Sequence, residues 1–529
     1  MTKKTYKRRK ISKTKETLHR REDLKYGLIL EGLGVGLLAG LIVSLFRFTL
    51  LKVEEMRNLY VEAAGQKFLV LLLGLGILIF ILVCTVAITK REILSQGSGI
   101  PQVEAELMGK ANANWVQVII AKFLGSILAI GGGMSLGSEG PSVQLGAMAG
   151  KGISRINNRL KTEEKLLLTC GAGAGLAAAF GAPLAGVVFT LEELHKNFSR
   201  EVLLTTMASC ITANCISSYI FGLKPVFDFT VVNGMPLNRL WMVLILGIIL
   251  GAFGVFYNKT TFFMQDVFKK INPVVAKIVI PFVMIVTLAI FLPHAVGSGA
   301  DLIEPAGQGV FNIKMLLILL VVKYISSALS FGSGLPGGTF LPMLVLGALS
   351  GGLFTQVLSP AVGYTQTYVE YFVILGMAGY FSAIVRAPIT GIILISEMTG
   401  TFSNLLPLAM VSLVAYMVAD MLKGGPLYEQ LTERLVEGGK VKNILRKSKI
   451  LIESEVYYGS LMDERSLSHI DLPAGCLVVS ILRNNHEIVP HGGTTIKAGD
   501  KLVILCNEEI VMEVQKELDQ KCRTMFSTK

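Results

Sequence analysis

The chain has 529 residues, of which 52% are hydrophobic and 17% charged, whereas an ordinary soluble domain carries about 25% charged residues. This composition excludes a plain soluble enzyme and favours an all-α polytopic membrane protein, in which the 55 Gly allow close helix packing. The seven Cys form no C-x-x-C pair and the six His are scattered, so we expect neither a disulfide framework nor a metal site.

The first 25 residues form a basic tail. They hold eleven Lys and Arg residues in a chain whose net charge is +12. The positive-inside rule places this tail in the cytoplasm, next to anionic lipid headgroups. Nucleic-acid binding is the alternative for such a tail, but a basic segment that abuts an apolar one is more typical of a topology signal, and we expect no nucleic-acid partner. The apolar stretch that follows is too long for a cleaved signal peptide.

Many apolar segments follow the tail, and several are far shorter than the ~20 residues that cross a bilayer. Gly and Pro interrupt them, so the sequence predicts short, broken helices whose freed backbone groups face protein or a water-filled cavity. The expected segments are 26–53, 68–89, 115–131, 166–191, 202–221, 240–257, 274–293, 315–331, 341–358, 371–384, 388–396 and 405–421.

An internal repeat divides this apolar region into two halves. GSG at 97–99 recurs at 297–299, a second block recurs 201 residues on (Lys122 and Lys323), and a third recurs 205 residues on (Glu192 and Glu397). Three blocks in the same order at nearly constant offset indicate two homologous halves, about 26–225 and 226–436. In transporters such halves commonly have inverted topology, with the substrate site at their interface near the midplane.

The chain changes character near Gly424. A charged stretch precedes a tail in which 476–484 and 500–507 have the pattern of buried strands and 508–518 that of a helix. We expect a membrane domain at 26–436, a linker at 437–450 and a small cytoplasmic α+β domain at 451–529.

Three Gly-rich, Pro-containing breaks precede apolar helices: GSGIP at 97–101, GSEGP at 137–141 and GGTFLP at 337–342. Such breaks expose backbone N–H groups at helix starts, where the helix dipole adds partial positive charge. A site of this kind binds anions without a full positive charge beside the ion, so the ion can leave again. Small residues also serve ordinary close packing, but three breaks at repeat-related positions are stronger evidence for an anion site.

Several ionisable residues lie in or beside these apolar helices. Glu139 has no basic residue near it in sequence, and its repeat partner is Phe340, which favours a function over an architectural role. Glu192 and Glu193 end an apolar helix, where at least one of them fits a solvated helix end. Lys122 and Lys323 are as well explained by snorkelling or an ion pair as by a direct role in an anion pathway.

Taken together, GSGIP, GSEGP, GGTFLP and PLAGVVFTLEE closely resemble the CLC family of chloride channels and chloride–proton antiporters, over about 26–436. The resemblance implies a homodimer of multi-pass subunits in the cell membrane, with both termini cytoplasmic and an ion pathway in each protomer. It implies chloride as the substrate and no cofactor. It further implies that Ser98, the amides of Thr339 and Phe340, and the phenol of Tyr428 bind chloride. Glu139 would be the gating glutamate, and Glu193 the internal proton-transfer glutamate of the antiporter branch.

A Glu at 193 favours the antiporter branch over a passive channel of the same fold. One departure is Ser138, where the family usually has a basic residue, so the local positive potential is expected to be lower. A fluoride-selective branch is a further alternative, although Ser98 in an intact GSGIP and Tyr428 fit the chloride type better. A cation transporter lacks support because no TVGYG-type filter is present, and no membrane-enzyme motif occurs.

The tail resembles the C-terminal regulatory domain of RCK type (TrkA-C-like) found on potassium-transport proteins. Members of that family dimerise, and some bind cyclic di-nucleotides, so we expect regulation by a ligand such as cyclic di-AMP. A dimer-stabilising module without ligand is the alternative. The candidate ligand residues are Val479, Ser480, Arg483, Asn485, His486 and Pro490.

Overall fold

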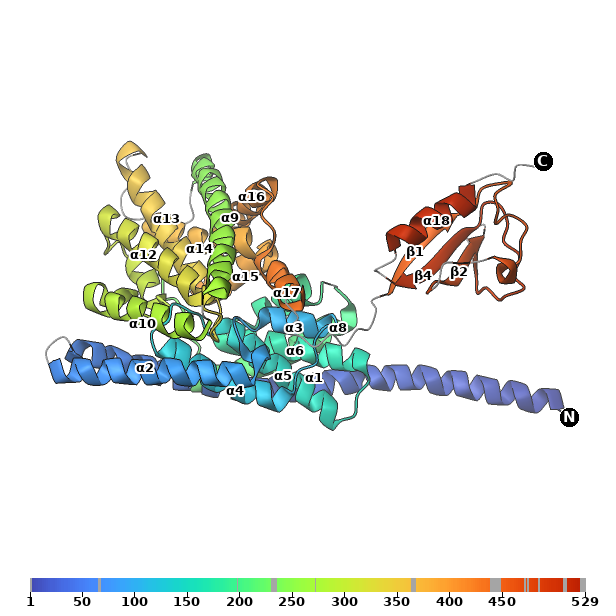
Figure 1. Cartoon of the computed structure of the whole chain (residues 1–529), viewed down its shortest axis with the longest axis horizontal. Helices are drawn as coiled ribbons and strands as arrows, with labels where there is room; N and C mark the ends of the chain where they lie inside the picture. The colour runs from blue at the N-terminus through green and yellow to red at the C-terminus, as the bar shows by residue number, and fades with distance from the viewer. Residues whose placement is uncertain are drawn as a thin grey trace. The chain divides into compact units, whose positions relative to one another are not determined.

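The computed structural model describes residues 2–64, 68–196, 198–229, 236–271, 273–362, 368–437, 449–470, 472, 475–483, 486–507 and 511–523. These residues form two compact units, Met1–Lys442 and Asn443–Lys529 (Figure 1). Most of the predicted linker, residues 438–448, lies outside the described residues.

The described residues of the first unit are mainly helical. A set of eight helices is followed by a second set of eight, whose members correspond to those of the first set in the same chain order. Seven helices among the described residues are long and apolar enough to cross a membrane. The first set comprises α1 (Thr2–Ala64), α2 (Phe68–Arg91), α3 (Ile100–Leu107), α4 (Trp115–Gly131), α5 (Glu139–Ile156), α6 (Lys161–Phe180), α7 (Pro183–Phe189) and α8 (Arg200–Phe221). The second comprises α9 (Trp241–Lys270), α10 (Pro273–Phe291), α11 (Ile303–Gly307), α12 (Ile313–Gly332), α13 (Phe340–Val362), α14 (Val369–Val385), α15 (Pro388–Thr399) and α16 (Leu405–Met421), and α17 (Leu427–Glu437) follows.

The expected apolar segment 166–191 comprises the end of α6, a break and the whole of α7, so it contains one of the predicted broken helices. Gly181 adopts a left-handed φ of +66° at the end of α6, and Pro183 begins the next helix. A π turn, Thr190–Leu194, continues α7. The equivalent break in the second half uses Arg386 at φ +73°, so a non-glycine residue holds the left-handed conformation there.

Other predicted boundaries need smaller corrections. Helix α1 extends to Ala64 and α9 to Lys270, well past the expected ends at 53 and 257. Both extensions are polar and charged, so the apolar pattern stops before the backbone helix does. The apolar pattern likewise did not mark α3 and α17, which are short and carry several charged residues.

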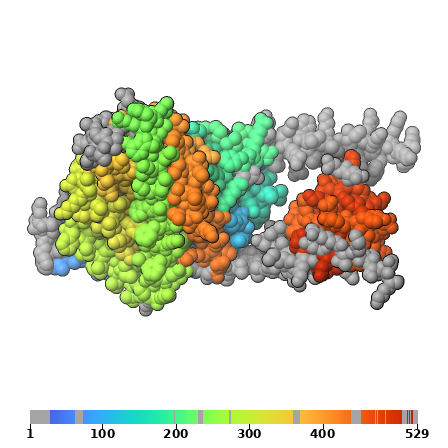
Figure 2. Space-filling model, turned by 90° about the horizontal axis from the view of Figure 1, so that it is seen from above, coloured from blue at the N-terminus to red at the C-terminus, as the bar shows by residue number. Residues whose placement is uncertain are grey.

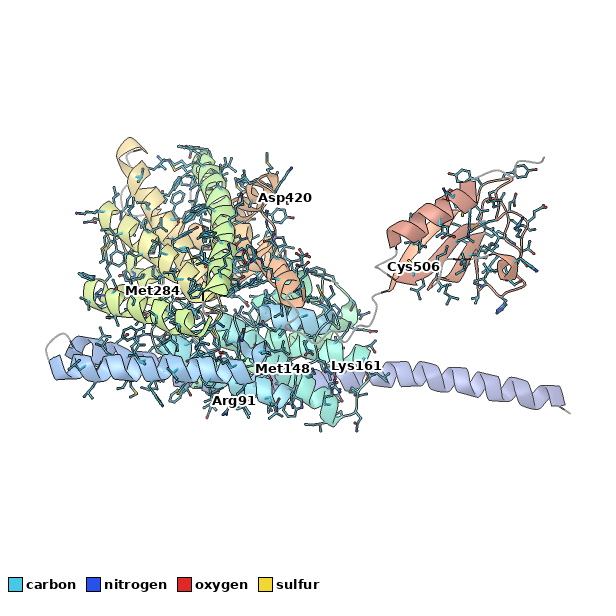
Figure 3. All side chains as sticks on the ribbon, viewed as in Figure 1. Arg91, Met148, Lys161, Met284, Asp420 and Cys506 are labelled. Atoms are coloured by element: carbon cyan, nitrogen blue, oxygen red, sulfur yellow. The ribbon has the colours of Figure 1, made fainter. Side chains whose placement is uncertain are left out.

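Helices α5 and α6 pack with their backbones in contact. A Cβ atom at Gly146 would lie 2.1 Å from the carbonyl oxygen of Gly171, and the reverse distance is also 2.1 Å. Met148, two residues further on α5 (Figure 3), is 1% exposed. The second half repeats the contact with Gly347 and Gly376. Glycine is required at these positions because only its missing side chain lets the helices approach so closely.

We expect Gly146→Val to destabilise the first unit strongly. The new side chain must push α6 away from α5, and overpacking of this kind costs about 3 kcal/mol or more. Thermal unfolding followed by size-exclusion chromatography measures the effect in detergent. Gly76→Val on α2 is the control, because no atom lies within 4 Å of a Cβ there. Equal midpoints for the two variants would contradict the packing argument.

The second unit has one four-stranded antiparallel sheet in the order β1-β4-β2-β3. Its strands are β1 (Lys449–Glu455), β2 (Leu477–Arg483), β3 (His486–Ile488) and β4 (Lys501–Asn507), and α18 (Val511–Arg523) packs against β1. Cys506 on β4 (Figure 3) is fully buried. The two predicted strands are present, two more flank them, and the helix runs to Arg523 instead of 518. Residues 508–510 lie outside the described residues.

An ion pair ties β2 to the start of β4. Nε and Nη2 of Arg483 donate to the two carboxylate oxygens of Asp500 at 2.7 and 2.6 Å, and the backbone N–H of Lys497 donates to Asp500 at 2.9 Å. Burial of Asp500 opposes ionisation, but these hydrogen bonds outweigh it and lower the pKa of its carboxyl group below the usual value.

The second unit should therefore lose stability in acid. Because the pKa of Asp500 is lower in the folded than in the unfolded chain, its contribution is present above the unfolded value of about 3.9 and disappears as the pH falls through the folded value. Limited proteolysis of the full chain between pH 7 and pH 3 measures it. Asp500→Asn should lower the free energy of unfolding of the second unit by about 2 kcal/mol at pH 7, and stability should then fall less steeply in acid. An unchanged pH dependence would contradict the assignment.

Candidate anion and proton site

Two repeat-related lysines hold the glycine breaks in place. Nζ of Lys122 donates to the carbonyls of Ser95 and Gly97 at 3.1 and 2.7 Å. Nζ of Lys323 donates to the carbonyls of Ala295 and Gly297 at 3.3 and 2.7 Å. A third bond of Lys323, 2.9 Å long, goes to the hydroxyl of Ser135. Both ammonium groups are buried, so they do not snorkel. Neither is within ion-pair distance of a described carboxylate, so snorkelling and an ion pair are both wrong as explanations of these lysines.

Backbone hydrogen bonds join the two halves at these breaks. Gly137 and Gly338 form an antiparallel bridge, with N–H to carbonyl distances of 2.7 and 2.8 Å. Gly97 also accepts from Gly337 at 3.0 Å and donates to Gly334 at 3.2 Å. These bonds place the starts of α5 and α13 side by side at the centre of the first unit. The repeat interface is therefore made of helix starts, as the three breaks predict.

Three buried hydroxyl groups lie at these helix starts. Ser98 precedes α3, Thr339 precedes α13 and Tyr428 is the second residue of α17. Their exposed fractions are 2%, 0% and 0%, and their oxygen atoms make no hydrogen bond of regular geometry with the described residues. The phenol of Tyr428 has only a weak interaction with the Thr339 hydroxyl. A Cβ at Gly140 would lie 2.4 Å from the Ser98 hydroxyl, so GSGIP and GSEGP are in direct contact. Buried hydroxyls are normally paired, so this orphaned set indicates a missing acceptor such as an anion.

Phe340 contributes an apolar wall in addition to its backbone amide. Its side chain is fully buried, and its ring centroid lies 5.3 Å from that of Phe180 and 4.9 Å from that of Phe381. These aromatic residues exclude water next to the start of α13, where a low dielectric strengthens the attraction between an anion and the helix-start N–H groups.

The carboxylate of Glu139 lies at the same place. Glu139 is the first residue of α5, is 1% exposed, and interacts with the backbone N–H groups of Glu139 itself and Leu341. The hydroxyl of Ser138 is 3.3 Å from Oε1, and Oε2 makes no regular hydrogen bond with the described residues. The carboxylate therefore takes part of the space that the helix starts offer to an anion.

Sequence reasoning missed Arg47, which supplies positive charge near Glu139 from α1. Its guanidinium interacts electrostatically with Glu139 and lies 4.3 Å from the ring centroid of Phe221. A single Arg inside a long apolar helix is the signal that could have identified it. Arg47 thus supplies part of the positive potential that a basic residue at position 138 would provide.

The adjacent residues Glu192 and Glu193 have different surroundings. The carboxylate of Glu192 accepts from the backbone N–H groups of Ile389 and Thr390 at 3.3 and 2.8 Å, at the start of α15. Its repeat partner Glu397 does the same for Leu184 and Ala185, at the start of α7. Each of these two glutamates therefore caps a helix of the other repeat, and Glu192 is a helix cap between the repeats rather than only a solvated helix end.

Glu193 lies within a cluster of charged residues. It is 6% exposed and interacts electrostatically with Glu104, Lys196, Glu192 and Glu429. Nζ of Lys196 bridges Glu104 on α3 and Glu429 on α17 at 3.0 and 3.2 Å. Tyr428 interacts electrostatically with both Glu139 and Glu193, so its phenol is near both carboxylates. Glu104 and Lys196 were not found from sequence, because only the fold brings α3 and the π turn together.

The candidate ligand residues of the second unit lie mostly along β2 and β3. Ser480 is 6% exposed and its hydroxyl has no hydrogen-bond partner among the described residues, whereas Val479 and Pro490 are half-buried and His486 is exposed. Arg483 is already paired with Asp500. Asn485 lies outside the described residues. The set therefore offers one orphaned hydroxyl beside exposed polar groups.

The first unit thus has two sets of helices in the same order, which meet at buried helix starts, three buried hydroxyl groups and one carboxylate. This combination defines an intramembrane ion-transport protein built from a repeat. The family described as voltage gated chloride channel matches residues 80–420, and the TrkA-C domain matches residues 451–519. The chain belongs to the voltage-gated chloride channel (CLC) family, as its motifs predict.

Named relatives of the chain are transporters and not enzymes. The H(+)/Cl(−) exchange transporter ClcA of Vibrio cholerae serotype O1 is 35% identical over 436 residues, which cover 80% of this chain and 92% of that protein. The ClcA protein of Yersinia pestis is 39% identical over 349 residues, covering 64% and 72%.

Solved structures show the same fold. A slow cyanobacterial Cl−/H+ antiporter aligns with a TM-score of 0.74 at 28% identity, covering 78% of this chain and 99% of that one. A CLC-type fluoride/proton antiporter aligns with a TM-score of 0.63 at 25% identity, covering 76% and 97%.

Proposed function

We propose that this protein exchanges chloride for protons across the cell membrane. The observation that carries the proposal is the buried Glu139 carboxylate at the start of α5, beside the orphaned hydroxyls of Ser98, Thr339 and Tyr428. Relatives named as chloride–proton exchangers and a neighbouring antiporter structure support it.

The mechanism follows from competition for one position. The ionised carboxylate of Glu139 interacts with the helix-start N–H groups and blocks chloride; once protonated it loses this attraction, moves away and lets chloride bind. Protonation and chloride binding are thereby linked. Ser98 and Tyr428 bind the chloride through their hydroxyl groups, and the N–H groups of Thr339 and Phe340 bind it at the start of α13.

Glu193 is the proposed proton carrier between Glu139 and the cytoplasm. The neighbouring Lys196 carries a positive charge that favours its ionised form, and the neighbouring carboxylates favour its protonated form. Such a balance suits a group that must gain and lose a proton in each cycle. Glu104 and Lys196 would position it.

Proteoliposomes loaded with a pH dye test the function. A chloride gradient imposed on the wild-type protein should drive protons uphill, and total chloride flux is recorded in the same preparation. Chloride flux without proton movement would identify a passive channel instead. Repeating the experiment with fluoride in place of chloride tests the fluoride-selective alternative, which predicts faster exchange with fluoride.

We further propose a homodimer in the plasma membrane, with an ion pathway in each protomer and both termini in the cytoplasm. The basic tail and the positive-inside rule support the topology. Crosslinking in intact membranes and protease access to each terminus in inside-out vesicles test the assembly and the orientation.

The second unit is proposed to regulate transport by binding a cyclic di-nucleotide such as cyclic di-AMP. The TrkA-C match, the orphaned Ser480 hydroxyl and the exposed His486 support this. Labelled cyclic di-AMP should bind the full chain in detergent, and His486→Ala should weaken binding at least about tenfold, or about 1.4 kcal/mol. No binding at high micromolar ligand would leave the unit as a dimer-stabilising module.

A further inference from the structure

A pocket of about 370 Å³ lies between α9 and the turn that joins α16 to α17. Its first wall is the α9 face that runs from Val255 to Asp266, and its second wall comprises Lys423, Gly424, Gly425 and the side chains of Gln430 and Arg434. On the surface of the first unit, α9 (green) lies directly beside the orange segments that include α16 (Figure 2). None of the roles assigned above uses this pocket.

The pocket carries an excess of positive charge. Three basic side chains and one acidic side chain line it, and Arg434 is paired with Asp266 at 2.9 and 3.3 Å and stacks 4.6 Å over the Phe262 ring. Lys259 and Lys423 are exposed, and no described carboxylate pairs with them. Two ammonium groups without counter-ions in one concavity attract an anion.

The turn that carries Lys423 is held rigidly. Lys423 has a left-handed φ of +54°, and its N–H donates to the carbonyl of Asp420 at the end of α16 (Figure 3) at 2.8 Å. A Cβ at Gly424 would lie 2.6 Å from Val255, so the turn is pressed against α9. Asn258 adds a polar floor: its Nδ2 donates to the carbonyl of Gly425 at 3.2 Å, and its Oδ1 is buried and has no partner among the described residues.

The apolar part of the lining continues onto a surface that faces lipid. Phe256 and Phe263 on α9 are 58% and 61% exposed, as expected for aromatic side chains in contact with acyl chains. Lys269 and Lys270 end the helix one to two turns later, and the positive-inside rule places that end in the cytoplasm. The pocket therefore opens where the apolar surface meets a basic one, in the cytoplasmic leaflet.

We propose that this pocket binds the phosphate group of an anionic phospholipid from the cytoplasmic leaflet. Lys259 and Lys423 pair with the phosphate, and Phe263 contacts the acyl chains. Basic pockets between membrane helices on the cytoplasmic side recognise anionic headgroups in this way. The ligand would contact the turn that begins α17, the helix that carries Tyr428. The binding itself does not depend on the proposed chloride–proton exchange.

Thermal unfolding of the full chain in neutral detergent tests the site with three probes: dihexanoyl phosphatidylglycerol, dihexanoyl phosphatidylcholine and inorganic phosphate. Phosphatidylglycerol should raise the unfolding midpoint saturably, and phosphatidylcholine, which has no net charge, should not. Lys259→Gln/Lys423→Gln should weaken the effect at least about tenfold, and Lys259→Arg/Lys423→Arg should retain it.

The matched control is Lys90→Gln/Lys270→Gln, which removes the same charge from the last turns of α2 and α9 outside the pocket. It should respond like the wild type. An undiminished response in Lys259→Gln/Lys423→Gln, or an equal loss in the control, would overturn the site. An equal response to inorganic phosphate and phosphatidylglycerol would overturn the lipid as the source of the phosphate.

Discussion

Replacing Glu139 with glutamine is expected to abolish chloride-driven proton movement while chloride still crosses the membrane. The amide cannot release a proton, so the linkage between protonation and chloride binding disappears. It also carries no charge, so it no longer competes with chloride for the helix-start N–H groups of α5 and α13. Proton flux in dye-loaded proteoliposomes should fall to the level of protein-free vesicles.

Glu55→Gln is the control for this change, because Glu55 is an exposed carboxylate on α1 paired with Lys52. It should pump protons like the wild type. Uphill proton movement that survives in Glu139→Gln would contradict the gating role of Glu139. Loss of both chloride and proton flux, with an unchanged unfolding midpoint, would mean that the side chain blocks the site irrespective of its charge.

The second large effect separates two kinds of glutamate in the same region. Glu193→Gln should stop proton movement and leave both chloride flux and the unfolding midpoint unchanged, because Glu193 caps no helix among the described residues. Glu397→Gln should do the reverse: it weakens the charged cap on α7, which costs about 1 kcal/mol, and leaves proton movement intact.

Proton flux and the unfolding midpoint are measured for both variants. Glu193→Gln should lose only proton flux, and Glu397→Gln should lose only stability. Glu192→Gln should behave like Glu397→Gln, because the two residues cap each other's repeat. A loss of proton movement in Glu192→Gln with normal stability would instead assign the proton path to Glu192.

Composition and local chemistry were sufficient for the overall class of the protein. Apolar runs indicate a membrane protein because charged residues are costly in lipid. Gly and Pro mark helix starts because Gly adopts the left-handed turn conformation without strain and Pro fits the first turn of a helix. The offsets between Lys122 and Lys323 and between Glu192 and Glu397 revealed the repeat, and the motifs named the family. These features are local in the chain, so the sequence carries them directly.

Only the tertiary structure decided what the individual charges do. Glu192 and Glu193 are neighbours with the same chemistry, and the packing of α15 against α7 makes one a helix cap and leaves the other beside Glu104 and Lys196. Lys122 and Lys323 hold carbonyl groups of distant segments, which no local pattern predicts. Buried charges are governed by the partners that the fold brings to them across about 25 to 230 residues, and local sequence patterns do not record those partners.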